Sequence, residues 1–332
     1  MIRFVAGTVV LITCCLYAFY LQAASPEIEK ARQYGALGQV TLRVTDSTGK
    51  PVEKALMSVA FFPSDSYVDA DVRAGQTDTN GCFCIEGKTV GDLTFSITKS
   101  NYYTTTGKHW FYRKGENCLL NNRWQPWNPT NTVVLKEHRI FLPMFAKNVD
   151  TQMPIQDAPV GFDLEVGDWQ SPHGKGEKAD ILFAYSATIH DFWNYSNQLV
   201  VACSNKMNGL YRDSKDMWSD FYSTYEANSN GYQPQFVFSF VTTKEKKLRD
   251  QRLEPSEYLI FRIRTVLDDK GNIVSAQYGK IYGPIEYGRV DENHGGVRFT
   301  YYLNPTPNDR NLEFDPSRNL FGQTDRQRVY QP

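Results

Sequence analysis

The fold of this chain is decided by residues 77–98, which read TDTNGCFCIEGKTVGDLTFSIT. Residues 78–81 are turn formers, and the glycine among them permits the positive φ that a tight turn requires. Apolar residues then recur at every second position in 82–85 and again in 93–98. This period of two is typical of half-buried strands, so the stretch predicts two strands with a turn before the first.

The same pattern occurs on both sides of this stretch. Residues 40–44 alternate in the same way, residues 46–51 form a turn, and apolar residues alternate again over 57–61 and 133–135. Several short strands separated by turns, with no convincing helix between them, predict a β-sandwich. We expect one short helix before it, capped by Ser25 and ending near Tyr34.

Two runs in this region resemble the carboxypeptidase regulatory-like, or transthyretin-like, domain. Residues 44–55, VTDSTGKPVEKA, look like its opening hairpin, and residues 77–85, TDTNGCFCI, are similar to its second signature, a D-x-x-G turn before an F-x-I strand. The resemblance covers residues 37–137. It implies a small transthyretin-like or immunoglobulin-like sandwich that serves as an accessory module on surface and secreted proteins and has no catalytic residues of its own.

The second half predicts a larger β-rich domain over residues 138–303, entered through a proline-containing junction at 143–159. A hairpin turn is expected at 268–272. Strands are expected at residues 160–166, 181–187, 198–203, 236–241, 258–266, 273–281 and 297–303. The predicted fold class is therefore mainly β, with two tandem antiparallel sandwiches, the second of which could be a jelly roll. Residues 304–332 carry four prolines and predict an extended C-terminal arm. Short phrases in this half resemble bacterial exported proteins of unassigned function.

The composition and net charge indicate which classes of binding partner are disfavoured. The 332 residues are 41% hydrophobic, 22% charged and 14% aromatic, which is typical of a globular protein rich in sheets. The formal net charge is −1, and no block of Lys and Arg forms a basic patch. Nucleic-acid binding is therefore disfavoured.

The first 24 residues resemble an export signal. A positively charged start, residues 1–3, precedes an uncharged apolar run at 4–21 and small residues suited to cleavage. The run is 18 residues long, so a retained membrane anchor is the alternative to a cleaved signal peptide. We expect an exported protein, secreted or periplasmic, that contacts a membrane only through this segment.

Four cysteines remain after the leader, and three pairings are open to them in an oxidising compartment. Cys82 and Cys84 lie two apart on an expected strand, point to one face and are poor partners for each other. The preferred bridge joins one of them to Cys118.

No local motif marks an enzyme. The sequence contains no H-E-x-x-H or H-x-x-E zinc pair, no G-x-S-x-G elbow and no P-loop. Neither a metal nor a cofactor is predicted, and no catalytic residue is assigned.

Six tryptophans carry the one hint of a ligand. Trp124, Trp127 and Trp193 lie in polar, loop-like contexts, and an exposed indole can stack on a sugar ring. The competing interpretation is that these side chains fasten loops to the sandwiches, because large aromatic residues are usually well buried. Residues 218–225 place four aromatic rings at helical spacing and predict a helix with one buried face.

Three functions remain open. The first is a non-catalytic exported protein that binds carbohydrate or another surface protein. The second is a secreted glycan-active hydrolase whose site in the second domain has no local motif. The third is a structural component of a surface assembly. The absence of a catalytic motif favours the first, with polysaccharide or a surface protein as its partner.

Overall fold

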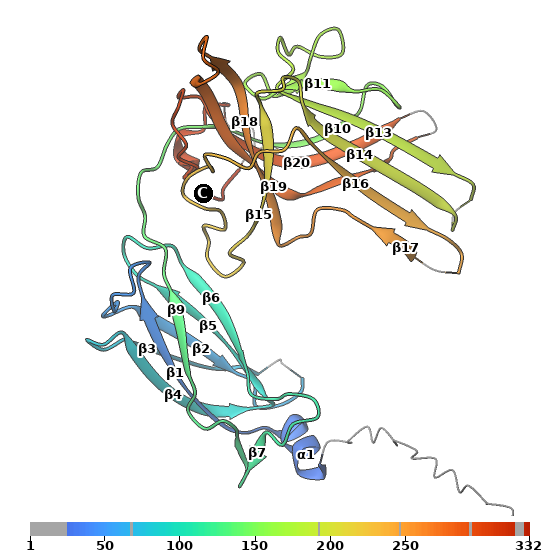
Figure 1. Cartoon of the computed structure of the whole chain (residues 1–332). Helices are drawn as coiled ribbons and strands as arrows, with labels where there is room; N and C mark the ends of the chain where they lie inside the picture. The colour runs from blue at the N-terminus through green and yellow to red at the C-terminus, as the bar shows by residue number, and fades with distance from the viewer. Residues whose placement is uncertain (1–24, 67–68, 192, 246, 292–293, 323–328) are drawn as a thin grey trace, which may run out of the picture.

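The computed structural model describes the chain from residue 25 onward, except for residues 67–68, 192, 246, 292–293 and 323–328. The predicted leader, residues 1–24, lies outside the described residues. Most of the described chain is strand, and the sheets pack in pairs, so the predicted mainly β, sandwich architecture is confirmed (Figure 1). One helix, α1 (Pro26–Tyr34), begins at Ser25, whose side chain accepts a hydrogen bond from the Ile28 N–H, and ends at Gly35. This is the helix that the sequence predicted.

The first pair of sheets lies within residues 36–134. The β1 sheet contains β4 (Cys82–Thr89), β1 (Ala36–Thr45), β9 (Thr130–Val134), β8 (Arg123–Trp124) and β7 (Leu119–Leu120). The β2 sheet contains, in spatial order, β3 (Asp71–Gln76), β2 (Leu56–Phe61), β5 (Asp92–Thr98) and β6 (Thr105–Trp110). Pairing is antiparallel, except that β8 and β9 run parallel to β1.

The alternation seen in the sequence forms the core of this first sandwich. Val40, Leu42 and Val44 of β1 are fully buried, and they meet Leu93 and Ile97 of β5 from the facing sheet. A strand buries every second side chain, so the polar residues between them lie outside.

A second, larger pair of sheets begins at residue 145. The β19 sheet has the order β10 (Phe145–Gln152), β20 (Gly295–Asn304), β19 (Ile273–Arg289), β18 (Glu257–Leu267) and β15 (Gly209–Ser214). The β13 sheet has the order β12 (Asp168–Trp169), β11 (Val160–Asp163), β13 (Ile181–Ile189), β14 (Tyr195–Cys203), β16 (Gln235–Thr242) and β17 (Lys247–Asp250). Every pairing in both sheets is antiparallel.

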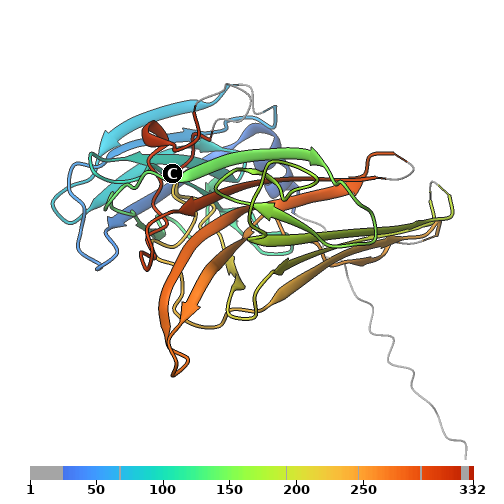
Figure 2. The ribbon, with the colours of Figure 1, turned by 90° about the horizontal axis from the view of Figure 1, so that it is seen from above.

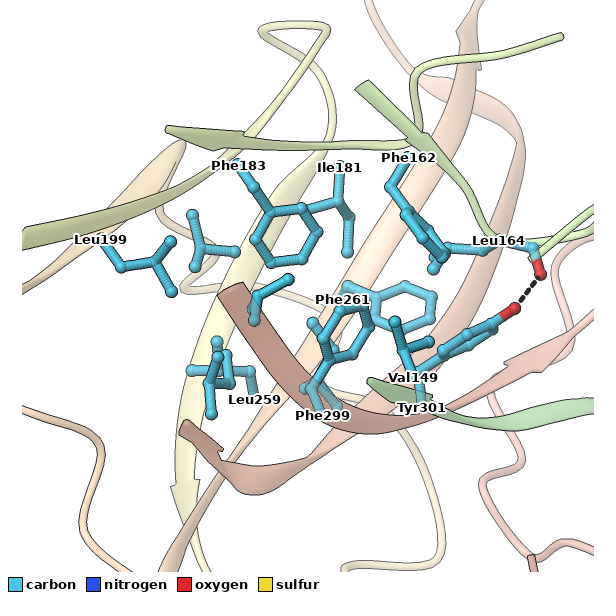
Figure 3. Packing of buried hydrophobic residues seen from close by; sticks show 14 of the residues in the cluster. Val149, Phe162, Leu164, Ile181, Phe183, Leu199, Leu259, Phe261, Phe299 and Tyr301 are labelled. Carbon is cyan, nitrogen blue, oxygen red and sulfur yellow. Dashed lines mark hydrogen bonds between the residues drawn. The ribbon is translucent and has the colours of Figure 1, made fainter. Parts of the chain in front are cut away.

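The core of the second sandwich lies between these two sheets. Phe162 and Phe183 of the β13 sheet contact Phe299 of the β19 sheet, with ring centroids 5.7 and 5.1 Å apart. The Tyr301 hydroxyl donates to the Leu164 carbonyl at 2.7 Å, so its single polar atom is satisfied within the core (Figure 3).

The outer face of the β19 sheet is covered by irregular chain. Leu312 and Phe314, which follow β20, are fully buried there against Tyr258 and Tyr302. The segment 304–332 was predicted to be an extended arm. Its described residues are irregular, with one 3-10 turn (Pro316–Arg318), but Leu312, Phe314 and Val329 pack into the molecule as part of a third layer.

Two predictions about connecting segments are wrong. The expected junction at 143–159 contains the strand β10. Residues 218–225 form no helix. Their backbone instead joins the edge of β6, where the Thr106 N–H donates to the Trp218 carbonyl at 2.7 Å.

Residues 218–225 also link the second sandwich to the first. The ring of Phe221 stacks on Tyr103 at 5.0 Å, and the Tyr103 hydroxyl donates to the buried carboxylate of Glu313 at 2.7 Å. Lys136 donates to the carbonyls of Phe221 and Ser223.

The predicted disulfide does not form: the four cysteines of the described chain are free thiols. Strand register gives the reason. Cys84 pairs with Thr41, whereas the β7–β8 hairpin after Cys118 meets β1 at Leu37, opposite Lys88. Four residues of strand span about 13 Å. The Cα atoms of a disulfide lie within about 7 Å of each other.

Candidate functional site: an aromatic groove in the second sandwich

The prediction that Trp124 binds a ligand is wrong, because its side chain is fully buried. Its indole N–H donates to the Thr89 carbonyl at 2.7 Å, and its ring lies against Gly91. The indole fastens the β7–β8 hairpin to the first sandwich.

Trp127 is half-buried and lies beneath the guanidinium of Arg123, 4.8 Å from the ring centroid. It lines none of the grooves described below. Its ligand role stays a prediction.

Trp193 lies at the tip of the hairpin that joins β13 to β14, and 58% of its surface is exposed. The tip is shaped by Asp191, whose Oδ1 accepts from the backbone N–H of Trp193 at 2.7 Å and of Asn194 at 2.8 Å. The Asn194 side chain donates to Asp191 Oδ2 at 2.6 Å. Such an Asx turn fixes the backbone that carries the indole.

Beside this tip lies a groove of about 890 Å³, which we call the aromatic groove. The β13–β14 and β19–β20 strand pairs extend to the same side of the second sandwich (Figure 2). Residues from β13, β14, β16 and β19 line the groove. Its aromatic side chains are Tyr185, Trp193, Tyr195, Phe240 and Tyr287.

Two glycines shape the groove, because neither has a side chain that would occupy its volume. A Cβ at Gly295 would lie 2.2 Å from the ring of Tyr185, so the absence of a side chain there lets that ring pack in. A Cβ at Gly288, which lines the groove, would meet no atom within 4 Å. Gly288 therefore faces empty space.

Polar atoms converge on the groove from several strands. The hydroxyl of Tyr287 is buried and makes no hydrogen bond with the described residues. The hydroxyl of Tyr185 and the Oδ1 of Asn197 are also buried, and the Asn197 side chain lies close enough to the Tyr185 hydroxyl to interact with it. Burial raises the pKa of both tyrosines, that of Tyr287 to about 12, against the opposing charges of Arg289 and Arg252 respectively. Both hydroxyls thus stay protonated at neutral pH and can donate.

Two arginines flank the rings. Arg252 forms a two-bond pair with Asp250 and lies over Phe240, 4.8 Å from its centroid. Arg289 donates through Nε to the Asp291 carbonyl at 2.8 Å. Guanidinium groups held in this way offer fixed N–H donors at the rim.

Among the described residues lining the groove, Asp191 is the one carboxylate. Its hydrogen bonds to the Asn194 side chain and to the two backbone N–H groups lower its pKa, so it is ionised and engaged in the turn. Hydrolysis of a glycosidic bond ordinarily uses two carboxyl groups on either side of the bond. The arrangement can stack on and hydrogen-bond a ligand.

A cluster of carboxylates near β11 stabilises the fold through hydrogen bonds to backbone N–H groups and to an arginine. Asp163 accepts from four backbone N–H groups, and Asp180 holds Arg264 through two bonds of 2.8 Å. Within the described residues no group of three or more His, Cys, Asp or Glu could hold a metal ion. A search of the same residues finds no helix with the length and apolar character needed to cross a membrane.

No family model matches the sequence, and curated proteins give no match. Among solved structures the chain is similar to 3-chlorocatechol 1,2-dioxygenase from Rhodococcus opacus 1CP, at 12% identity and a TM-score of 0.26. That match covers 32% of this chain and 61% of the dioxygenase. It is also similar to the shaft pilin SpaA of Lactobacillus rhamnosus GG, at 8% identity over 79% and 93% of the two chains, with a TM-score of 0.22.

A carbohydrate-binding candidate from Bacteroides uniformis ATCC 8492 is similar at 10% identity, over 80% of this chain and 97% of that chain, with a TM-score of 0.18. All three TM-scores lie far below 0.5. These similarities therefore do not indicate a function for this chain.

Sequence reasoning found Trp193 but missed the rest of the aromatic groove. Phe240 lies in a predicted strand, and Tyr195 and Tyr287 lie beyond the ends of two others. An aromatic residue in or near a strand is expected to fill the core. The tertiary fold brings these rings together around one groove, and no local pattern encodes that.

Proposed function

We propose that the protein is a non-catalytic, exported carbohydrate-binding protein and that the aromatic groove is its binding site. The observation that carries the proposal is the exposed indole of Trp193 beside the groove's other rings and its amide and guanidinium groups. A sugar ring presents apolar C–H faces to aromatic rings and hydroxyls to polar groups, so it matches both kinds of lining.

The buried polar atoms support the same ligand class. An unsatisfied hydroxyl or amide costs about 1–3 kcal/mol, and a ligand rich in hydroxyls can supply the missing partners. Tyr185, Asn197 and Tyr287 would then select for hydroxyl positions, whereas Trp193 would supply stacking area. Export rests on the sequence of residues 1–24, and the regulatory-like character of residues 37–137 rests on the two quoted motifs. Both remain proposals.

The direct test is glycan binding by the full chain. A glycan array would identify a ligand, and calorimetric titration of that glycan would give its Kd. We expect Trp193→Ala to weaken binding about tenfold or more, as for a central aromatic anchor. Gly288→Leu should have a similar effect, because a Cβ at this position meets no atom within 4 Å and the rest of the side chain would occupy the groove.

The matched control is Trp127→Ala, which removes an indole outside the groove and should leave Kd unchanged. Glycan binding that survives both groove substitutions would overturn the assignment of the site. Failure of the full chain to bind any glycan at millimolar concentration would overturn the proposed function. Release of reducing ends from a bound glycan would point instead to the hydrolase alternative.

A further inference from the structure

A second groove lies at the open side of the first sandwich, and two tryptophans far apart in the sequence line it. This groove, which we call the seam groove, measures about 720 Å³ and lies between the edge strands β6 and β9. Trp110 lines it from the first sandwich and Trp218 from the segment that joins the sandwiches. They are 52% and 49% exposed.

The backbone fixes the spacing of these two indoles. Ser219 is bridged to Thr105, the Thr106 N–H donates to the Trp218 carbonyl at 2.7 Å, and the Asp220 N–H donates to the Thr104 carbonyl at 2.9 Å. Trp218 is therefore level with Thr106. Trp110 follows four residues later on the same strand, about 13 Å away along its axis.

Between the indoles the lining is polar. It includes Thr106, Lys108, Asn131 and Thr132, with Lys108 paired to the carboxylate of Asp92. The amine of Lys108 also lies over one face of the Trp110 ring, 5.4 Å from its centroid, so a sugar ring would stack on the opposite face.

His109 places an unused donor in this lining. Its Nδ1 lies 2.9 Å from Asn131 Nδ2, and because that amide nitrogen can only donate, Nδ1 accepts and the ring proton is on Nε2. Burial, with a smaller contribution from Arg113, lowers the pKa of His109, so the ring is neutral at pH 7. Nε2 is buried and has no hydrogen-bond partner among the described residues.

The strand edges add further hydrogen-bonding groups. Bonds alternate along an antiparallel ladder, and Thr106 points its N–H away from β5, so Lys108 and Trp110 also direct their backbone groups into the seam. On the other side the Thr41 N–H donates to the Pro129 carbonyl and the Leu135 N–H to the Thr45 carbonyl. The residues of β9 that pair with β1 thus alternate with residues that face the groove.

We infer that the seam groove is a second carbohydrate site, which holds an extended glycan stacked on Trp110 and Trp218 across the junction of the two sandwiches. Two platforms about 13 Å apart suit a chain of several sugar units rather than a monosaccharide. The inference extends the proposed function but does not depend on the aromatic groove.

The test uses the full chain and linear hexasaccharides of glucose, mannose, xylose and N-acetylglucosamine, with the matching disaccharides, in calorimetric titrations. We expect at least one hexasaccharide to bind about tenfold or more tightly than its disaccharide, because only the longer chain reaches both indoles. Trp110→Ala and Trp218→Ala should each weaken that binding about tenfold. Trp127→Ala is the control and should have no effect.

Stoichiometry separates this inference from the proposed function. A chain with both sites should bind two hexasaccharides, and Trp110→Ala with Trp218→Ala should reduce the number to one, which Trp193→Ala then removes. Binding abolished by Trp193→Ala alone would overturn the seam site and leave the proposed function intact. Capture of a β-strand peptide of alternating Thr and Val at the seam, with no hexasaccharide bound there, would also overturn it and indicate strand pairing with β6.

Discussion

Two tryptophans three residues apart have different environments, and this difference separates structural from accessible indoles. Trp124 is fully buried and hydrogen-bonded to Thr89, whereas Trp127 is half-buried under Arg123. We expect Trp124→Ala to lower the free energy of unfolding by about 3–5 kcal/mol, as for other large-to-small core changes. Trp127→Ala should cost less than about 1 kcal/mol. Urea unfolding of the two variants checks this, and equal losses would contradict the burial.

The buried amine of Lys280 makes stability depend on pH. It lies among the rings of Phe221, Tyr282 and Tyr302, and its Nζ donates to Ser223 at 2.9 Å. Burial, with a smaller effect of the Lys136 charge, lowers the pKa of Lys280 to about 7. The unfolded chain keeps a value near 10.4. Between these values the unfolded state binds more protons, so the free energy of unfolding rises with pH.

We expect the wild-type chain to gain about 2 kcal/mol between pH 7 and pH 9 relative to Lys280→Met, because one pH unit corresponds to about 1.4 kcal/mol per proton. Urea unfolding at the two pH values measures both proteins. The comparison with the variant removes the contributions of other groups that titrate in this range. Parallel changes in the two proteins would show that Lys280 has an ordinary pKa in the folded state.

At the scale of elements, a bulge in β18 turns Arg264 out of the alternation that the sequence predicts. The register shifts between Ile263 and Val266, and Arg264 has a φ of +52°. Its guanidinium reaches Asp163 and Asp180, and both carboxylates are almost fully buried. Burial raises the pKa of Asp180, opposed by Arg264. The backbone N–H groups around Asp163 outweigh burial and lower its pKa.

Arg264→Met should therefore lower the free energy of unfolding by about 3–5 kcal/mol at pH 7, because it leaves buried carboxylates without their cation. The deficit should shrink as the pH falls toward 4, where a carboxylate freed of Arg264 takes up a proton more readily. Urea unfolding across this range is the measurement. A deficit below 1 kcal/mol at pH 7, or one that grows in acid, would contradict the account.

The elements that the sequence predicted correctly are mostly central strands, and those it missed lie at sheet edges. Strands such as β13 and β18 have neighbours on both sides and a clear apolar alternation. The edge strands β3, β10, β15 and β17 carry charged residues instead, which is how proteins protect exposed edges. Their pattern is therefore weak.

The two grooves could not be predicted for a different reason. Trp193 stands out in the sequence as an aromatic residue in a polar loop. The contact of residues 218–220 with β6 joins positions more than a hundred residues apart, and the helical spacing of residues 218–225 favoured a helix that does not form. Only tertiary structure reveals such a site.

At the scale of the whole molecule, residues 218–225 and the buried Glu313 contact the first sandwich from the second, and the two proposed grooves lie in different parts of the chain. The aromatic groove is lined by residues of β13, β14, β16 and β19, and the seam groove by residues of β6 and β9. Sites on separate sandwiches can engage one polysaccharide at two points, which raises its apparent affinity without new contacts. This would suit a protein that binds a polymer outside the cell.

The most direct measurement is a crystal structure of the full chain with the glycan that binds it most tightly. The account predicts a sugar ring stacked on the indole of Trp193, with its hydroxyls within hydrogen-bond distance of Asn197 or of the Tyr185 and Tyr287 hydroxyls. An aromatic groove that stays empty while the saturating glycan occupies some other surface would contradict it.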